Sequence, residues 1–274
     1  IIGKSTGVAA GSTECGLNTI SGLKTSGNFL VSGILNNSAV SNNIFKNKIY
    51  NIEANNASGT VDGIQVALGT AVNVYNNIIG DLRTPSSNLA NPLVGINVLG
   101  GTTVSVDHNT VVLNGASTGA LFGSSAFAVS ATPTNPLVIR NNIFVNNSSV
   151  MGVGSATAIR ATDATASKIN ASSNNNLVYG STLFTDGTNS DTTLGGYQSR
   201  MTPRESVSIS ENPTFVSTTG ADATFLHINS LVANGVSNAG QPIATITTDF
   251  DGEARNASTP DIGADEFALN GTTW

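Results

Sequence analysis

The side chains best suited to bind a cation form an acidic string near the C-terminus. They are Asp249, Asp251, Asp261, Asp265 and Glu266. Carboxylate oxygens are the hard ligands that Ca²⁺ prefers, so the string is a candidate Ca²⁺ site, although its spacing differs from that of an EF-hand loop. The competing interpretation is a structural closure in which Arg255 pairs with one or two of these carboxylates. We favour the structural interpretation, which requires no cofactor.

Gln65, Asn97 and Arg160 are candidates for contact with a glycan. Each directly follows an apolar residue in one of the repeats described below, so the three are expected on one outward face. Arg160 is the only cation expected there, and the nearest carboxylates are Asp62 and Asp163. A lone arginine near one aspartate is more often a surface pair than a catalytic site.

Other kinds of chemistry find little support in the sequence. His108, His227 and the single cysteine, Cys15, suggest neither a serine–histidine–aspartate triad nor a zinc site. No glycine-rich phosphate loop precedes a helix-forming segment. Asp81 and Arg83 are expected to form a surface pair. A pair of glycosidase carboxylates from distant parts of the chain stays open, because such residues need no fixed spacing.

Composition limits the class of partner. Charged residues make up only 10% of the 274, the net charge is −6, and the pI is about 4.7. Nucleic-acid binding is disfavoured, because phosphate recognition needs clustered Lys and Arg. No apolar run is long enough to cross a bilayer, so no membrane insertion is expected. Apolar residues still make up 39% and recur periodically, which argues against disorder.

The elements that would position these residues are repeats of about 32 residues. An Asn-Asn or His-Asn pair followed by apolar residues recurs at intervals of 32 to 34 residues. The second residues of these pairs are Asn43, Asn77, Asn109, Asn142 and Asn176. β-Branched residues, Asn and Gly dominate the repeats and helix formers are sparse. Each repeat is therefore predicted to be one coil of three short strands.

Further sets of residues share this period and are predicted to stack inside the coils, because alternate strand residues point inward. The first column comprises Ile34, Ile64, Ile96, Phe127 and Ile159, and the second comprises Asn36, Val66, Val98, Val129 and Ala161. A third comprises Val40, Val74, Val106 and Ile139. The residues that precede the first column are expected to form a small, neutral outward face: Gly33, Gly63, Gly95, Ala126 and Ala158.

The Asn pairs are predicted to lie at corners between strands, because Asn tolerates the left-handed backbone of a tight turn. Side-chain amides at equivalent positions could bond from coil to coil and form a ladder. Which Asn of each pair points inward stays open, because a corner shifts the alternation. His108 replaces one Asn, and we expect a structural role for it.

These features predict an all-β fold, a right-handed parallel β-helix of about five to six coils with an irregular C-terminal closure. Residues 1–180 would form the coils. Residues 181–274, where the period fades, would form looser final coils and a closing segment of the same domain, because an open β-helix end needs covering. Variable segments at 80–92, 114–124 and 147–156 are predicted to be loops that leave the coils.

The phrase Asn-Asn-Ile-Phe-x-Asn at 42–47 and 141–146 resembles the right-handed parallel β-helix repeat family. Motifs near the C-terminus are similar to those of large secreted surface proteins of Bacteroidetes-type bacteria. Those motifs lie at 212–216, 225–228, 230–240, 249–255 and 260–266. The resemblance implies secretion or cell-surface exposure, and a chain that is part of a longer one. It implies function only weakly, since the family includes polysaccharide lyases, other glycan-active enzymes and adhesins.

The function expected from the sequence is a non-catalytic structural or adhesive module of a large secreted or cell-surface bacterial protein. Its partner would be an extracellular glycan or another surface molecule. The alternative is a polysaccharide lyase or glycoside hydrolase on the same scaffold, but removing a proton beside a uronic carboxylate needs a base and a cation held together. An ice-binding solenoid ranks last, because Thr-x-Thr does not recur at the period.

Overall fold

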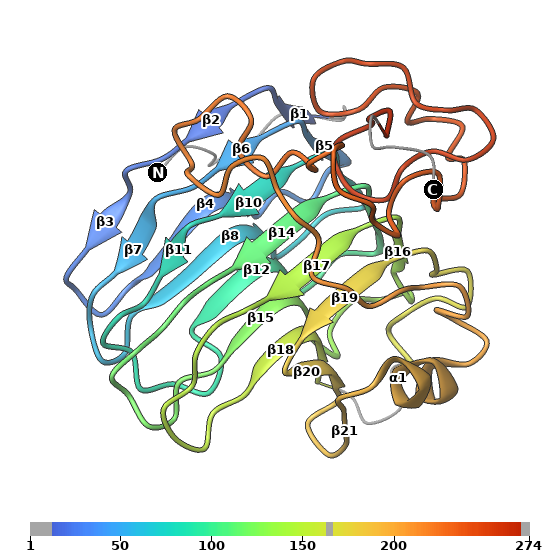
Figure 1. Ribbon diagram of the computed structural model, residues 1–274. Coiled ribbons are helices and arrows are strands. Elements are labelled where there is room, and N and C mark those ends of the chain that lie inside the picture. Colours follow the sequence, from blue (N-terminus) through green and yellow to red (C-terminus); the bar gives the residue numbers. More distant parts are fainter. Residues whose placement is uncertain (1–12, 163–166, 270–274) are drawn as a thin grey trace.

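The structure is a computed structural model that describes residues 13–162 and 167–269 (Figure 1). Within these ranges the chain folds as a parallel β-helix of about five turns, with one short helix. The predicted all-β parallel β-helix is confirmed. No helix in the described part of the chain is both long enough and apolar enough to cross a bilayer.

Strands from successive turns lie side by side in four sheets, here called sheets A to D. Sheet A contains β1 (Thr13–Gly16), β5 (Asn42–Phe45), β9 (Ala71–Tyr75), β13 (Thr103–Asp107) and β16 (Val138–Arg140). Sheet B contains β2 (Thr19–Ile20), β6 (Lys48–Ile49), β10 (Ile78–Gly80), β14 (Thr110–Leu113), β17 (Ile143–Asn146) and β19 (Leu177–Gly180). Sheet C contains β3 (Lys24–Thr25), β7 (Ile52–Ala54) and β11 (Leu82–Arg83).

Sheet D is the widest of the four. It contains β4 (Leu30–Asn36), β8 (Thr60–Val66), β12 (Leu93–Val98), β15 (Ser124–Val129), β18 (Ala156–Ala161), β20 (Thr182–Thr185) and β21 (Ser190–Asp191). All pairings are parallel except that of β21 with β20. Sheets A, B and D supply the three strands predicted for each turn, and the first three turns add a short strand of sheet C.

The predicted columns fill the interior. The first column is in register from turn to turn and continues to Phe184, and the second column is also in register. Phe127 also stacks on Phe144 of sheet B, with ring centroids 5.3 Å apart. The third column begins with Ile44, where the sequence suggested Val40. Apart from Asn36, these side chains belong to one continuous hydrophobic core.

The first Asn pair does not lie at the corner where the repeat pattern placed it. Asn42 and Asn43 belong to β5 of sheet A, whereas the later pairs lie at the following corner. The position equivalent to Asn77 is taken by Asn47, thirty residues earlier. The expectation is wrong in this turn because the same four-residue phrase occurs on a strand instead of at the corner.

An Asn ladder runs along the corner between sheets A and B. Its members are Asn18, Asn47, Asn77, Asn109, Asn142 and Asn176. The side-chain nitrogen of each donates to the side-chain oxygen of the next at 2.8 to 3.0 Å. The residues that precede the last four members have a left-handed backbone, with φ between 53° and 57°: Asn76, His108, Asn141 and Asn175. In these four pairs the second residue therefore points inward and the first points outward.

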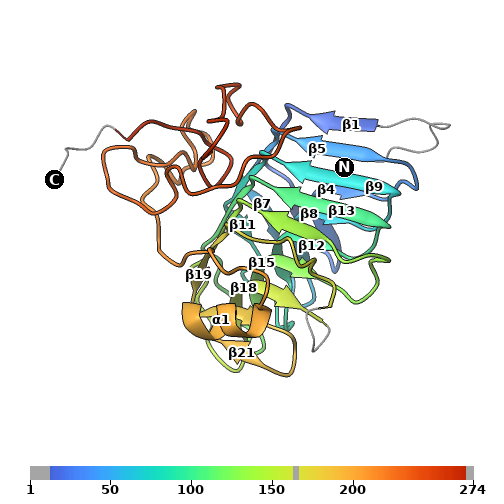
Figure 2. The same ribbon diagram turned by 90° about the vertical axis from the view of Figure 1, so that its right-hand side faces the viewer.

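The segment after residue 180 has two parts, of which the first covers the last turn of the β-helix and the second lies along sheet B. Helix α1 (Leu194–Met201) covers the last turn, and its Tyr197 and Met201 are fully buried against the interior. It lies at the end of the stack opposite β1 (Figures 1 and 2). Glu205 follows and ends the ladder, because its carboxylate oxygens accept hydrogen bonds from Asn176 Nδ2 at 3.0 and 3.1 Å.

Residues 209–269, here called the tail, lie along the outward face of sheet B and do not cover the end (Figure 2). The apolar side chains on the two sides of this contact form a second cluster: Ile78, Val112, Ile143, Val145 and Leu177 of sheet B, with Phe225, Leu226, Ile228, Val236, Ile262 and Ala264 of the tail. The outward Asn side chains bind the tail backbone. Asn76 donates to the Thr248 carbonyl at 2.7 Å, and Asn141 donates to the Gln241 carbonyl at 2.7 Å.

The variable segments between sheets B and D continue the coils, although they were predicted to leave them. The Thr118 amide donates to the Pro85 carbonyl at 3.0 Å, and the Ser149 amide donates to the Gly115 carbonyl at 2.8 Å. Backbone pairing between turns therefore extends beyond the strands, which satisfies polar groups that a protruding loop would leave to water.

Candidate functional site

The row of small residues expected on the outward face of sheet D lies inside. Gly33, Gly63 and Gly95 are buried, and a Cβ added to Gly63 would lie 2.6 Å from Ile79 Cγ2. Ala126 and Ala158 also belong to the hydrophobic core. The prediction assumed strict alternation, but strand pairing is interrupted at this position in every turn. Two consecutive residues can therefore face the interior.

The outward face of sheet D is instead organised around Asp62. Its Oδ2 accepts hydrogen bonds from Gln65 Nε2 at 2.5 Å and from Asn97 Nδ2 at 3.0 Å. Asp62 is only 3% exposed, and this burial raises the pKa of its carboxyl to about 6, against the opposing effect of the two amides. Two of the three predicted glycan contacts thus meet at a carboxylate.

Arg160 lies on the same face but does not reach this cluster. It is on β18, three strands from Asp62 on β8, which corresponds to about 14 Å at the usual strand spacing. Its guanidinium donates to Ser125 Oγ at 2.8 Å and to the Ser155 carbonyl at 3.0 Å, and burial lowers its pKa. Asp163, the other carboxylate expected nearby, lies outside the described residues.

This face therefore lacks a pair of opposed catalytic groups within the strands that the structure describes. Asp62 is the only carboxylate on the parallel strands β4, β8, β12, β15, β18 and β20, and Asp191 on the antiparallel β21 is paired with Arg200. Glycoside hydrolysis commonly uses two carboxylates about 5 to 10 Å apart. The neutral amides that hold Asp62 are hydrogen-bonding groups and do not supply the second acid or base.

The acidic string near the C-terminus divides into two groups. Asp249, Asp261 and Glu266 accept hydrogen bonds from backbone amides. Those donors are Gly252, Glu253 and Glu266 for Asp249, Asn238 and Phe267 for Asp261, and Asn256 and Asp261 for Glu266. Glu266 also pairs with Arg255 at 3.1 Å, which matches the ion pair proposed in the structural interpretation. These three carboxylates thus hold the fold of the tail.

The remaining two carboxylates meet a histidine that the sequence did not link to them, although Asp265 Oδ2 also accepts a hydrogen bond from the Ile228 amide at 3.0 Å. One ligand atom from each of His227, Asp251 and Asp265 lies within 4.8 Å of the others, and His227 Nε2 is 2.6 Å from Asp251 Oδ2. Burial raises the pKa of Asp265 to about 6. Burial lowers the pKa of His227, but the bond to Asp251 and the nearby carboxylates raise it on balance. This group is the best cation candidate among the described residues.

Two further expectations concern single side chains. Asp81 and Arg83 do form a partly exposed ion pair, and Arg83 Nε also contacts Glu53 at 3.0 Å. His108 is fully buried, with Nε2 2.8 Å from Asn141 Nδ2 and Nδ1 near the Gly263 carbonyl. Burial and then the charge of Arg255 hold its pKa well below the ordinary value. These contacts agree with the structural role expected for His108.

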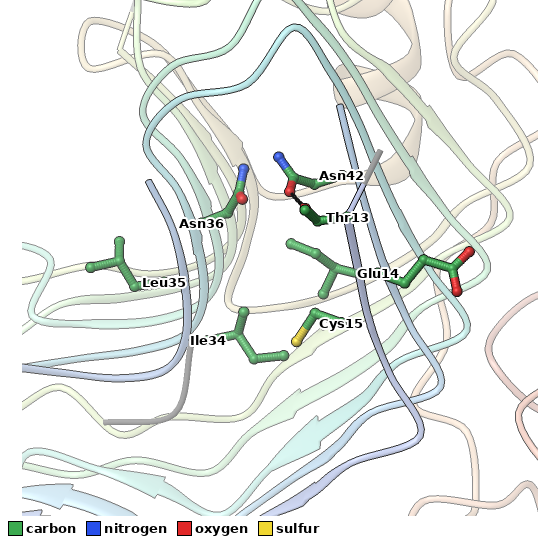
Figure 3. A pocket seen from close by; sticks show the side chains of 8 residues that line it. Thr13, Glu14, Cys15, Ile34, Leu35, Asn36 and Asn42 are labelled. Atoms are coloured by element: carbon green, nitrogen blue, oxygen red, sulfur yellow. Dashed lines mark hydrogen bonds between the residues drawn. The ribbon is translucent and has the colours of Figure 1, made fainter. Parts of the chain in front are cut away.

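A cavity of about 380 Å³ opens at the first turn, between β1 and β4 (Figure 3). Ile34 and Cys15 point toward one another across it, while Leu35 and Glu14 point away. Burial raises the pKa of the Cys15 thiol, which disfavours the reactive thiolate. Among the described residues, the cavity is the mouth of the apolar interior, and the carboxylate in its lining, Glu14, points away.

Comparisons with protein-family models, with curated proteins and with solved structures find no match for this chain. Its function therefore has to be argued from the geometry above.

Proposed function

We propose that the chain is a non-catalytic structural or adhesive module of a larger secreted or cell-surface bacterial protein. Sheet D would contact an extracellular glycan or another surface molecule through Asn97, Gln65 and Arg160. The resemblance to β-helix repeat proteins of Bacteroidetes-type bacteria supports the export and the longer parent chain. The parallel β-helix supports a role as a rigid scaffold, because each turn is held by the turns on both sides.

The observation that carries this proposal is the separation of Asp62 from Arg160. Each charge is held by neutral groups, Asp62 by two amides and Arg160 by hydroxyls and a carbonyl. A lyase needs a base and a charge-neutralising cation at the same sugar unit, and about 14 Å is too far for that. The net charge of −6 also opposes the approach of a polyanion, which favours a neutral glycan.

The alternative function is a glycoside hydrolase or polysaccharide lyase, and one observation favours it. The pKa of Asp62, raised by burial to about 6, would suit a general acid near neutral pH. Asp62 would then act with a group brought by a segment beside sheet D.

The test is to incubate the purified chain with neutral and anionic polysaccharides, with and without Ca²⁺, and to measure reducing ends and unsaturated products. We expect no turnover from the wild type. The variants Asp62→Asn and Arg160→Ala address the face, and Arg83→Ala is the matched control on sheet C. Turnover that is lost in either face variant but kept in the control would establish the enzyme instead.

Binding is measured on the same samples by affinity electrophoresis in gels that contain the polysaccharides. Retardation by a neutral polysaccharide that is weakened by Asn97→Ala would support contact through sheet D. Asn97 is chosen because it is half-buried, whereas Gln65 is buried. Absence of retardation by every polysaccharide would contradict glycan contact and leave the structural role or adhesion to another surface molecule.

A further inference from the structure

The outward face of sheet A carries an aromatic pair. Tyr75 on β9 stacks on Phe45 on β5, with ring centroids 5.2 Å apart and planes within 8° of parallel. Gly16 on β1 leaves room for the outer ring, because a Cβ there would lie 2.5 Å from Phe45 Cζ. Both rings are half-buried, so part of this aromatic surface faces solvent.

A polar row runs beside the rings on the same strands. Asn73 Nδ2 donates to Asn43 Oδ1 at 2.9 Å, and Ser105 Oγ donates to Asn73 Oδ1 at 3.0 Å. Asn73 is exposed. A side-chain amide has two donor hydrogens and an oxygen with two lone pairs, so these bonds leave Asn73 one donor and one acceptor site for a ligand.

An ion pair lies beside Tyr75 on the next two strands of sheet A. Tyr75 is in register with Asp107 on β13, which is in register with Arg140 on β16. Arg140 Nε and Nη2 bond to the two oxygens of Asp107 at 2.9 and 3.1 Å. Asp107 is 2% exposed, whereas the Arg140 side chain is 26% exposed. The charges cancel, and the guanidinium keeps three N–H groups beyond the two used by Asp107.

The tail converts this face into a cavity. The tail lies beside the C-terminal ends of the sheet A strands (Figure 2), and Asn76 fixes its backbone at Thr248. A cavity of about 470 Å³ remains between Thr245 and Ile246 of the tail and the sheet A side chains Asn43, Asn73, Tyr75, Ser105, Asp107 and Arg140. Ligand pockets commonly enclose about 300 to 1,000 Å³ and combine an apolar wall with a few directed polar groups. This cavity has both.

We propose that the cavity binds a sugar unit of a neutral oligosaccharide, stacked on Tyr75 and hydrogen-bonded to Asn73 and Arg140. A pyranose has an apolar face of C–H groups and a rim of hydroxyls, which matches an aromatic ring beside a planar amide and a guanidinium. A charged sugar matches less well, because Asp107 already neutralises Arg140. The inference rests on the glycan contact proposed above and assigns it to a second face.

The test is calorimetric titration of the chain with three neutral probes, cellohexaose, xylohexaose and mannohexaose, and with polygalacturonate as the anionic control. We expect at least one neutral probe to bind and polygalacturonate not to bind. Tyr75→Ala should weaken the binding of that probe at least tenfold, whereas Tyr75→Phe, which keeps the ring, should stay within about threefold. Tyr179→Ala on sheet B is the matched control for loss of a half-buried tyrosine.

Melting temperatures show whether each variant is folded, and Asn73→Ala at an exposed position replaces Tyr75→Ala if that variant does not fold. Weaker binding in the sheet A variants supports the cavity, and a further loss in Asn97→Ala would show that sheet D contacts the same glycan. Unchanged binding in the sheet A variants with weaker binding in Asn97→Ala overturns the cavity but leaves glycan contact through sheet D. Absence of binding by all three neutral probes at millimolar concentration, or tighter binding of polygalacturonate, overturns the inference.

Discussion

The interior of the β-helix and the tail along sheet B are both apolar and buried, but they are held in place in different ways. Each interior contact recurs in register from turn to turn, as in the column that contains Ile64 and Ile96. Each tail contact occurs once, as where Phe225 and Leu226 pack against Ile78 and its neighbours in sheet B. A repeated contact leaves a period in the sequence, whereas a single long-range contact does not. The following substitutions test whether the two regions also differ in stability.

The largest effect is expected from Phe127→Ala in the interior. Phe127 is fully buried and touches turns on both sides, so its loss should leave a cavity that costs about 3–5 kcal/mol of unfolding free energy. Guanidinium denaturation followed by circular dichroism measures this cost. The matched tail variant is Phe225→Ala, which should mainly raise hydrogen exchange in residues 209–269. An equal fall in the denaturation midpoint for both variants would show that tail and interior unfold as one unit.

The next largest effect is a pH dependence of stability, which is expected at Glu205, where the Asn ladder ends. Burial raises the pKa of Glu205 from 4.5 to about 7. The folded chain therefore holds the proton more tightly than the unfolded chain. The resulting stabilisation is complete below pH 4.5 and is lost as the pH rises through 7, a change of about 3 kcal/mol.

Glu205→Gln should remove this pH dependence, because the amide does not ionise. The measurement is the denaturation midpoint between pH 4 and pH 8, compared between wild type and variant, since Asp62, Asp261 and Asp265 also titrate near pH 6. Glu253→Gln, at an exposed tail position, is the control and should follow the wild type. Parallel curves for wild type and Glu205→Gln would refute the role assigned to the end of the ladder.

The sequence predicts which residues lie in the interior, because parallel pairing places similar side chains at the same position of each turn. It fails at Asn43, where the corner phrase occurs on a strand, and at Gly63, where an interrupted pairing breaks the alternation. Both failures have the same cause: a period shows which residues are equivalent but not how the backbone turns between them.

The candidate sites show the same limit. Gln65 and Asn97 could be predicted as neighbours, because their spacing equals one turn. Tyr75 and Asp107 also differ by one turn, but their shared row appears only when the corners are aligned correctly. The approach of His227 to Asp251 could not be predicted, because the tail has no period that relates one of its segments to another.

A smaller loss of stability is expected from substitutions in the Asn pairs at the corner between sheets A and B, and it should differ between the inward and the outward residue. Asn109 accepts hydrogen bonds from the backbone and side chain of Asn77 at 3.0 and 2.8 Å, so Asn109→Ala leaves buried groups unpaired. The expected cost is about 1–3 kcal/mol of unfolding free energy. Asn141→Gly is the outward counterpart: glycine accepts the left-handed backbone, so the losses are the side-chain contacts with Gln241 and with His108 Nε2. Its denaturation midpoint should change less than that of Asn109→Ala, while tail hydrogen exchange increases.

The smallest effect is expected in the tail at His227. Its partner Asp251 has a side chain that is 46% exposed, and such an ion pair contributes about 0–1 kcal/mol. His227→Ala in chelator should therefore change the melting temperature little. The effect should grow when a divalent cation is present, because a ligand that binds only the folded state stabilises it by mass action.

The choice of cation distinguishes the two sites that the acidic string could form. Imidazole suits Zn²⁺, whereas Ca²⁺ prefers oxygen ligands alone, so a site of His227, Asp251 and Asp265 should respond to Zn²⁺. We expect Zn²⁺ to raise the melting temperature of the wild type and not of His227→Ala, with Ca²⁺ having no effect on either. A rise with Ca²⁺ that persists in His227→Ala would instead indicate the oxygen-only site first suggested by the sequence. Asp249 would then have to exchange its backbone amide donors for the ion, and Asp249→Asn would abolish the rise.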